Sequence, residues 1–271
     1  MAKQNNKEKN NMEIILEELG PRFKDYKNYA YQPSDEIAIL KAVLLAKHKR
    51  LTESNRFRQN YNFTLMQNSK ESVENILERA ITLTNNNQMK DSFYNQYPFD
   101  RGQHIDLLHK TKQGFEAIEL KQWANDKDSP LYALIEILKY YFLLIKKEHL
   151  EFKKENQYLK QEQIKELTIL APLEYYKNFD FLNTFNELKK LSDKLAASLS
   201  KERNIPIKIF FKYFNLEPNI FENIKNSLVD KEGNSLKNKE KIITDWTFKE
   251  NQEKLKQIET NLLWLNWKTI F

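Results

Sequence analysis

The chain has 271 residues, of which 40% are hydrophobic and 30% charged, as in a globular protein with a full hydrophobic core. It contains no cysteine, which excludes a disulfide framework, thiolate catalysis and a cysteine-based zinc site, and which agrees with a cytoplasmic location. The formal net charge of +6 is compatible with a polyanionic partner.

The N-terminal part of the chain predicts a short lead-in followed by helices. Residues 1–11 are polar and lack the apolar stretch of a signal peptide, so we expect them to be disordered. Residues 12–68 are expected to form a helical segment. Within it, Ser34 is a good N-cap for an amphipathic helix that runs to about His48. The apolar face of this helix carries Ile37, Leu40, Val43 and Leu44.

A basic cluster in this segment is the candidate surface for nucleic-acid contact. It consists of Lys41, Lys47, Lys49, Arg50, Arg56 and Arg58, with Tyr61 and Phe63 following. Closely spaced positive charges complement the phosphates of a nucleic acid. The alternative is an ordinary solvated helix end.

A helix over residues 69–83 and a strand within 92–98 are expected next. The polar side of the helix carries Glu71, Glu74 and Glu78. Two segments of alternating polarity, 102–109 and 114–123, then predict a β-hairpin. Pairing Asp106 with Glu119 places its tight turn at Lys112 and Gln113 and lets Gly114 take a positive φ.

The predicted hairpin has one apolar and one charged face. The apolar face carries Ile105, Leu107, Ile118 and Leu120. On the other face, Asp106, Glu119 and Lys121 converge, because residues paired across a ladder share a face. A divalent metal would remove the cost of unpaired carboxylates there. The alternative is a solvated face with a cross-strand salt bridge. His104 shares the Asp106 face, either as a structural residue or in contact with metal or substrate.

Helices and strands alternate after the hairpin. The expected elements are a buried helix from Pro130 with a charged continuation to 166, a strand over 167–173, a helix over 184–200 and a strand over 205–214. A helix is also expected within 250–271, where an apolar stripe at helical spacing consists of Leu255, Ile258, Leu262 and Leu265. Residues 231–241 are the best candidate for a linker. We therefore expect a core over residues 69–230, then a linker and C-terminal helix over 231–271. The longest apolar run, 131–145, is too short to span a membrane.

This order of elements resembles the core of the PD-(D/E)XK nuclease superfamily, the restriction-endonuclease-like phosphodiesterases. The matching residues are Asp106 in an apolar strand and Glu119, Leu120 and Lys121 at the end of the next strand. The resemblance covers residues 69–173 and indicates no subfamily, and Ile105 stands where the superfamily's name has Pro. It implies an α/β fold with an αβββαβ core, in which a mixed sheet is flanked by helices, and with helical additions at both termini.

By this resemblance, Asp106 and Glu119 would hold one or two Mg²⁺ ions together with the backbone carbonyl of Leu120, and Mn²⁺ would be a substitute. Lys121 would orient or help deprotonate a water and oppose phosphate charge. Glu78 or Glu74 on the preceding helix is the candidate to complete the site, with an ordinary surface position as the alternative.

The helix after the hairpin carries one further likeness. Glu136 and Tyr140 loosely resemble a Gln-x-x-x-Tyr motif of one branch of the superfamily, with Glu in place of Gln.

The leading hypothesis is a metal-dependent endonuclease that hydrolyses phosphodiester bonds in DNA, in the role of a restriction or defence enzyme. RNA stays open as a substrate, and a homodimer would fit double-strand cleavage. One alternative is a catalytically inactive nucleic-acid-binding or scaffolding protein on the same fold. The other is a helical partner-binding protein in which the hairpin is incidental.

Overall fold

The strands of this protein form one mixed sheet. The computed structural model describes residues 10–25, 28–47, 93–100, 103–122, 129–148, 164–177, 183–216 and 260–271, with residues 74, 77, 78, 80–82, 84, 85 and 179. Within them the sheet has six strands in the order β1-β2-β3-β4-β5-β6. Their bounds are β1 Phe93–Asp100, β2 Gln103–Thr111, β3 Gly114–Leu120, β4 Ile164–Pro172, β5 Lys208–Phe214 and β6 Lys268–Thr269.

The sheet contains both antiparallel and parallel strand pairs. β1, β2 and β3 form an antiparallel meander, β3, β4 and β5 run parallel, and β6 returns antiparallel to β5. Parallel neighbours need a crossover connection, and helices supply it here. α4 (Pro130–Glu148) lies between β3 and β4 in the chain, and α6 (Asn183–Arg203) lies between β4 and β5.

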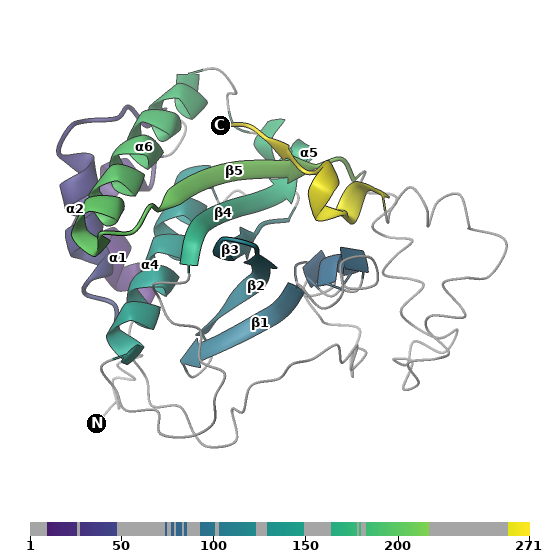
Figure 1. The fold of residues 1–271 in the computed structure, drawn as a ribbon. Helices are drawn as coiled ribbons and strands as arrows, with labels where there is room; N and C mark the ends of the chain where they lie inside the picture. Colours follow the sequence, from purple (N-terminus) through teal and green to yellow (C-terminus); the bar gives the residue numbers. More distant parts are fainter. Residues whose placement is uncertain are drawn as a thin grey trace, which may run out of the picture.

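Helices flank this sheet. Besides α4 and α6, the helices are α1 (Asn11–Leu19), α2 (Asp35–Val43) and α5 (Leu173–Lys177), with 3-10 turns η1 (Pro21–Phe23) and η5 (Trp264–Asn266). The described residues between 74 and 85 are also helical. Figure 1 shows α1, α2, α4 and α6 together on one side of the sheet, and the C-terminal segment in yellow away from them. The predicted α/β class, a mixed sheet flanked by helices, is therefore confirmed.

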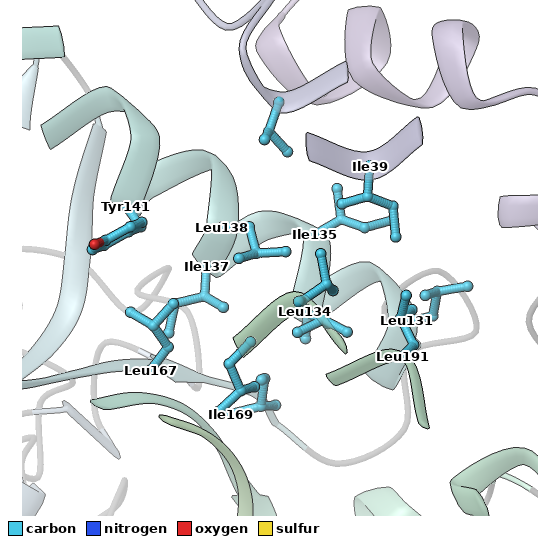
Figure 2. Close-up of a cluster of buried hydrophobic side chains, with 14 of the residues drawn as sticks. Ile39, Leu131, Leu134, Ile135, Ile137, Leu138, Tyr141, Leu167, Ile169 and Leu191 are labelled. Carbon is cyan, nitrogen blue, oxygen red and sulfur yellow. The ribbon is translucent and has the colours of Figure 1, made fainter. Parts of the chain in front are cut away.

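α4 is the centre of the main hydrophobic core. Figure 2 shows its side chains between two layers, with Leu167 and Ile169 of β4 on one side and Ile39 of α2 on the other. Leu134 and Ile135 of α4 are fully buried. The sequence predicted that this helix is buried, because it is apolar on most sides, and its position between two packed layers confirms that prediction. No helix in the described part of the chain is long and apolar enough to cross a membrane.

The β2–β3 hairpin has the predicted register. Leu107 pairs with Ile118 and Thr111 with Gly114, so the turn falls at Lys112 and Gln113. Gly114 has φ of 146°, a region that favours glycine. The Thr111 hydroxyl donates to the Gly114 carbonyl (3.0 Å) and accepts from the Gln113 N–H (3.2 Å), which closes the turn.

The N-terminal helices begin and end differently from the prediction. Asn10 and Asn11, expected in the disordered lead-in, begin α1, since the Asn10 side chain accepts from the Glu13 N–H (2.9 Å) and the Glu13 carboxylate accepts from the Asn10 N–H (2.9 Å). α2 ends at Val43, short of His48. The Asn11 side chain holds the backbone of Lys47 at both its N–H (2.9 Å) and its carbonyl (3.0 Å), which fixes the chain in a non-helical path.

Asp35 organises the start of α2. Ser34 occupies the N-cap position but makes no side-chain capping bond. The buried Asp35 carboxylate instead accepts from the Arg22 guanidinium, the Tyr29 hydroxyl (2.8 Å) and the Gln32 N–H (2.9 Å). Burial acts to raise the pKa of Asp35, but the hydrogen bonds from Arg22 and Gln32 outweigh it and lower the pKa. This ion pair joins η1 to α2.

The C-terminal tail differs from the predicted helix. After residue 263 the chain forms η5 and then β6, in which Lys268 pairs with Tyr213 and Thr269 with Lys212. Without β6, the edge of β5 would expose unpaired backbone N–H and C=O groups. Pairing with β6 satisfies some of these groups. Leu265, part of the apolar stripe that predicted a helix, is 70% exposed. Leu255, Ile258 and the predicted domain boundaries at 68 and 230 lie outside the described residues.

A buried polar network joins four strands to the C-terminal segment. The Glu116 carboxylate of β3 lies 3.1 Å from His109 Nδ1 of β2 and accepts from the Thr168 hydroxyl of β4 (2.6 Å). The same carboxylate also accepts from Lys212 Nζ of β5 at 2.6 Å and from Trp264 Nε1 at 2.9 Å. Burial acts to raise the pKa of Glu116, but His109, Lys212 and Thr168 outweigh it and lower the pKa to about 2. The ionised carboxylate therefore stabilises this side of the sheet.

Replacing Glu116 by Gln is expected to lower the free energy of unfolding at pH 7 by about 3–5 kcal/mol, because Lys212 is left buried without its counter-charge. The pKa of Glu116 lies below its ordinary value of 4.5, so its contribution is complete above that pH and is lost as the pH falls towards about 2. Urea denaturation at pH 7 and pH 3 measures both effects, and the difference between the two proteins should narrow at pH 3.

Glu166→Gln is the matched control. Glu166 lies 3.9 Å from Lys212 with 23% of its side chain exposed, so its loss should cost less than about 1 kcal/mol. Equal stability of Glu116→Gln and the native protein at pH 7 would contradict a stabilising role for the network.

Candidate metal centre

Asp106 and Glu119 come together because β2 and β3 pair in the predicted register. The last pair of the ladder is Leu107 with Ile118, and the next position along both strands is Asp106 with Glu119. The backbone N–H of Leu120 donates to Asp106 Oδ2 at 2.9 Å, which fixes the Asp106 carboxylate against β3. The shared face expected from the sequence is thus present.

Lys121 joins this pair from the residue after β3. Its Nζ donates to Glu119 Oε1 at 2.8 Å and to Glu136 Oε2 of α4 at 2.8 Å. Its backbone N–H donates to the carbonyl of Leu170 at 2.8 Å, which keeps the chain beside β4. The side chains of Glu119 and Lys121 are 4% and 6% exposed, so the alternative of a solvated sheet face does not hold.

Glu136 connects the strands to α4. Its Oε1 accepts from Lys139 Nζ (3.3 Å) and from the Tyr140 hydroxyl (3.1 Å). The sequence likeness singled out Glu136 and Tyr140, and in the structure Glu136 accepts hydrogen bonds from both Tyr140 and Lys121. Lys139, which is 5% exposed, was missed by the sequence reasoning. The signal that could have found it is its i,i+3 spacing from Glu136 on a helix otherwise buried.

The two strand carboxylates lie in an unfavourable environment for negative charge. Burial, the largest effect, raises the pKa of Asp106 to about 7, although Lys121 and the Leu120 N–H act in the opposite direction. Burial and then the charge of Asp106 raise the pKa of Glu119 well above its ordinary value. Each carboxylate therefore disfavours ionisation of the other.

The partners of these carboxylates carry the compensating charge. Burial acts to lower the pKa of Lys121, but Glu119, Glu136 and Asp106 outweigh it and raise the pKa. Burial acts to raise the pKa of Glu136, but Lys121 and Lys139 outweigh it and lower the pKa to about 2. An ion pair of Lys121 with Glu136 thus lies directly beside the Asp106–Glu119 pair.

Glu78 and His104 complete a group of possible ligands around Asp106. One side-chain ligand atom from each of Glu78, His104 and Asp106 lies within 4.8 Å of the other two. His104 Nε2 is 3.8 Å from Asp106 Oδ1. Glu78 is buried and comes from the helical residues before β1, as the sequence proposed. Glu74 contributes negative charge that raises the pKa of Asp106.

The donor set fits a divalent ion. Glu119 Oε2 is buried without a hydrogen-bond partner among the residues that the structure describes. A buried carboxylate oxygen in this state costs free energy, and a bound cation would remove that cost. Carboxylate oxygens are the ligands that hard divalent cations prefer. The residues present therefore fit a metal ion.

The predicted nucleic-acid surface is only partly described. Lys47 is exposed, and its backbone is held by Asn11. Lys49, Arg50, Arg56 and Arg58 lie outside the described residues.

Comparison with known proteins gives no relative. No protein-family model, no curated protein and no solved structure matches the chain. The residues and their geometry therefore carry the functional proposal.

Replacing Asp106 by Asn is expected to raise the free energy of unfolding of the metal-free protein at pH 8, by about 1–3 kcal/mol. The pKa of Asp106 rises from 3.8 to about 7 on folding, so its ionisation destabilises the fold increasingly as the pH rises through this window. Asn carries no charge and keeps an oxygen for the Leu120 N–H. Urea denaturation in EDTA should show the gain at pH 8 and almost none at pH 4.

The control is Asp193→Asn on α6, where an exposed carboxylate accepts from Lys189 at 3.1 Å and its loss should leave stability unchanged. A loss of stability in Asp106→Asn at pH 8 would mean that Asp106 is a structural partner of its neighbours and not a strained carboxylate.

Proposed function

We propose that this protein is a metal-dependent endonuclease of the restriction-endonuclease-like class that hydrolyses phosphodiester bonds in DNA. The observation that carries the proposal is the convergence of Asp106, Glu119 and Lys121 at the ends of adjacent strands, where Glu119 and Lys121 are buried. Two carboxylates with an ammonium beside them suit the transfer of a phosphoryl group, in which negative charge must be both held and opposed.

The order of elements supports this class. Helical residues precede an antiparallel meander of β1, β2 and β3, then α4 crosses over to β4, which is parallel to β3. This is the αβββαβ order that the sequence resemblance implies, with Asp106 on its second strand and Glu119 on its third. Topology and chemistry therefore favour the same class of protein.

The ions proposed are Mg²⁺, with Mn²⁺ as a substitute, held by Asp106 and Glu119 with the backbone carbonyl of Leu120. When bound, such an ion would lower the pKa of a coordinated water and stabilise charge on the scissile phosphate. Glu78 lies close enough to Asp106 to complete the ligand set.

Lys121 would act as a positioned ammonium. Its Nζ is held by two carboxylates, those of Glu119 and Glu136, at 2.8 Å each. From there it would orient the attacking water or oppose negative charge on the phosphate. DNA contact by the basic residues near Lys47, a homodimer and a role in restriction or defence are parts of the same proposal.

The test is cleavage of plasmid DNA by the purified chain with Mg²⁺, with Mn²⁺ and with EDTA. We expect cleavage that needs the metal and that falls by at least about a hundredfold in Asp106→Ala and in Lys121→Ala, because each removes charge stabilisation at the phosphate. Asp193→Ala and Lys189→Ala remove a carboxylate and an ammonium from an exposed pair on α6 and should cut normally.

The alternative is an inactive nucleic-acid-binding protein on the same fold. It predicts that the native protein and both site variants bind DNA equally and that none of them cleaves it. Metal-independent cleavage, or cleavage that survives Asp106→Ala and Lys121→Ala, would contradict the proposed centre. The same assay with RNA distinguishes the two possible substrates.

A further inference from the structure

His104 lies beside the proposed centre because it precedes Asp106 by two residues on β2, and such residues lie on the same face of a strand. Its Nε2 is 3.8 Å from Asp106 Oδ1, too long for a hydrogen bond. Its side chain is 38% exposed, so an ion can reach the imidazole from solvent.

The three side chains Glu78, His104 and Asp106 have spacings close to those of ligands on one ion. Ligand atoms each about 2.1 Å from an ion lie about 3–4 Å apart. The three atoms here all lie within 4.8 Å of one another, so small side-chain rotations would bring them to that geometry.

The chemistry of the imidazole agrees with a ligand role. Histidine is the commonest protein ligand of transition-metal ions, and His104 Nε2 lies 3.8 Å from Asp106 Oδ1.

A second observation indicates an ion at this place. Glu119 Oε2 is buried without a hydrogen-bond partner among the described residues, and the charge of Asp106 acts directly on Glu119. An additional cation next to Asp106 would oppose the negative charge that acts on Glu119, whose other oxygen, Oε1, accepts from Lys121 Nζ.

We propose that Glu78, His104 and Asp106 form an ion site in which His104 selects a transition-metal ion such as Mn²⁺ over Mg²⁺. Imidazole nitrogen is a good ligand for first-row transition ions, whereas Mg²⁺ takes oxygen ligands in a strict octahedron and keeps several waters. This inference rests on the proposed function, because it concerns the same metal centre. It predicts that Mn²⁺ binds more tightly than Mg²⁺, the reverse of what carboxylate ligands alone would give.

The test is ion binding to the full chain without DNA. Mn²⁺ is titrated by electron paramagnetic resonance and calorimetry, and Mg²⁺ by calorimetry. We expect Mn²⁺ to bind at least about tenfold more tightly than Mg²⁺. His104→Ala should lower the affinity for Mn²⁺ by at least about tenfold and change the affinity for Mg²⁺ by less than about threefold. His104→Gln, which offers an amide oxygen, should narrow or reverse the preference.

Lys110→Ala, an exposed residue on the same strand, is the control and should leave both affinities unchanged. Thermal denaturation verifies that each variant is folded. If His104→Ala is not folded, His104→Gln takes its place as the test variant. Equal effects of His104 substitution on both ions, or none, would overturn the inference even if Mg²⁺-dependent cleavage is found. Selective Mn²⁺ binding with no cleavage of nucleic acid would uphold it and count against the proposed nuclease.

Discussion

The register of β2 against β3 determines which residues meet in this protein, because side chains alternate between the two faces of a strand. A slip by one residue would move Asp106 to the face that carries Leu107 and would bring Ile118 opposite it. The two-residue turn at Lys112 and Gln113 fixes this register, with Gly114 in a conformation that suits glycine. The position of Glu119 opposite Asp106 follows from that turn.

β3 carries two carboxylates with opposite roles, three residues apart and therefore on opposite faces. Glu116 has a partner at both oxygens, and its pKa is lowered. Glu119 has a buried oxygen without a described hydrogen-bond partner, and burial and Asp106 raise its pKa. The same residue type in the same strand thus stabilises the sheet on one face and is held at a cost on the other. Functional sites commonly show this second condition.

Local patterns in the sequence were enough to predict much of the fold and the centre. The alternation around Asp106 and Glu119 predicted the hairpin, its turn and its charged face, since these depend on neighbours close in the chain. The contacts of Glu136 with Lys121 and of Trp264 with Glu116 join distant segments, and no local period encodes them. The apolar spacing around Leu265 predicted a helix, but pairing with the edge of β5 outweighed that preference.

The partners of Glu116 also constrain the order in which the chain can assemble. Lys212 and Trp264 follow it by 96 and 148 residues. During synthesis the N-terminal helices and the meander emerge well before either donor, so the side of the sheet under Trp264 cannot be closed until residue 264 has emerged. Contacts of such long sequence separation form late and slowly. A nascent chain, or one shortened before Trp264, would therefore lack this donor to the Glu116 carboxylate and leave that side of the sheet open to water.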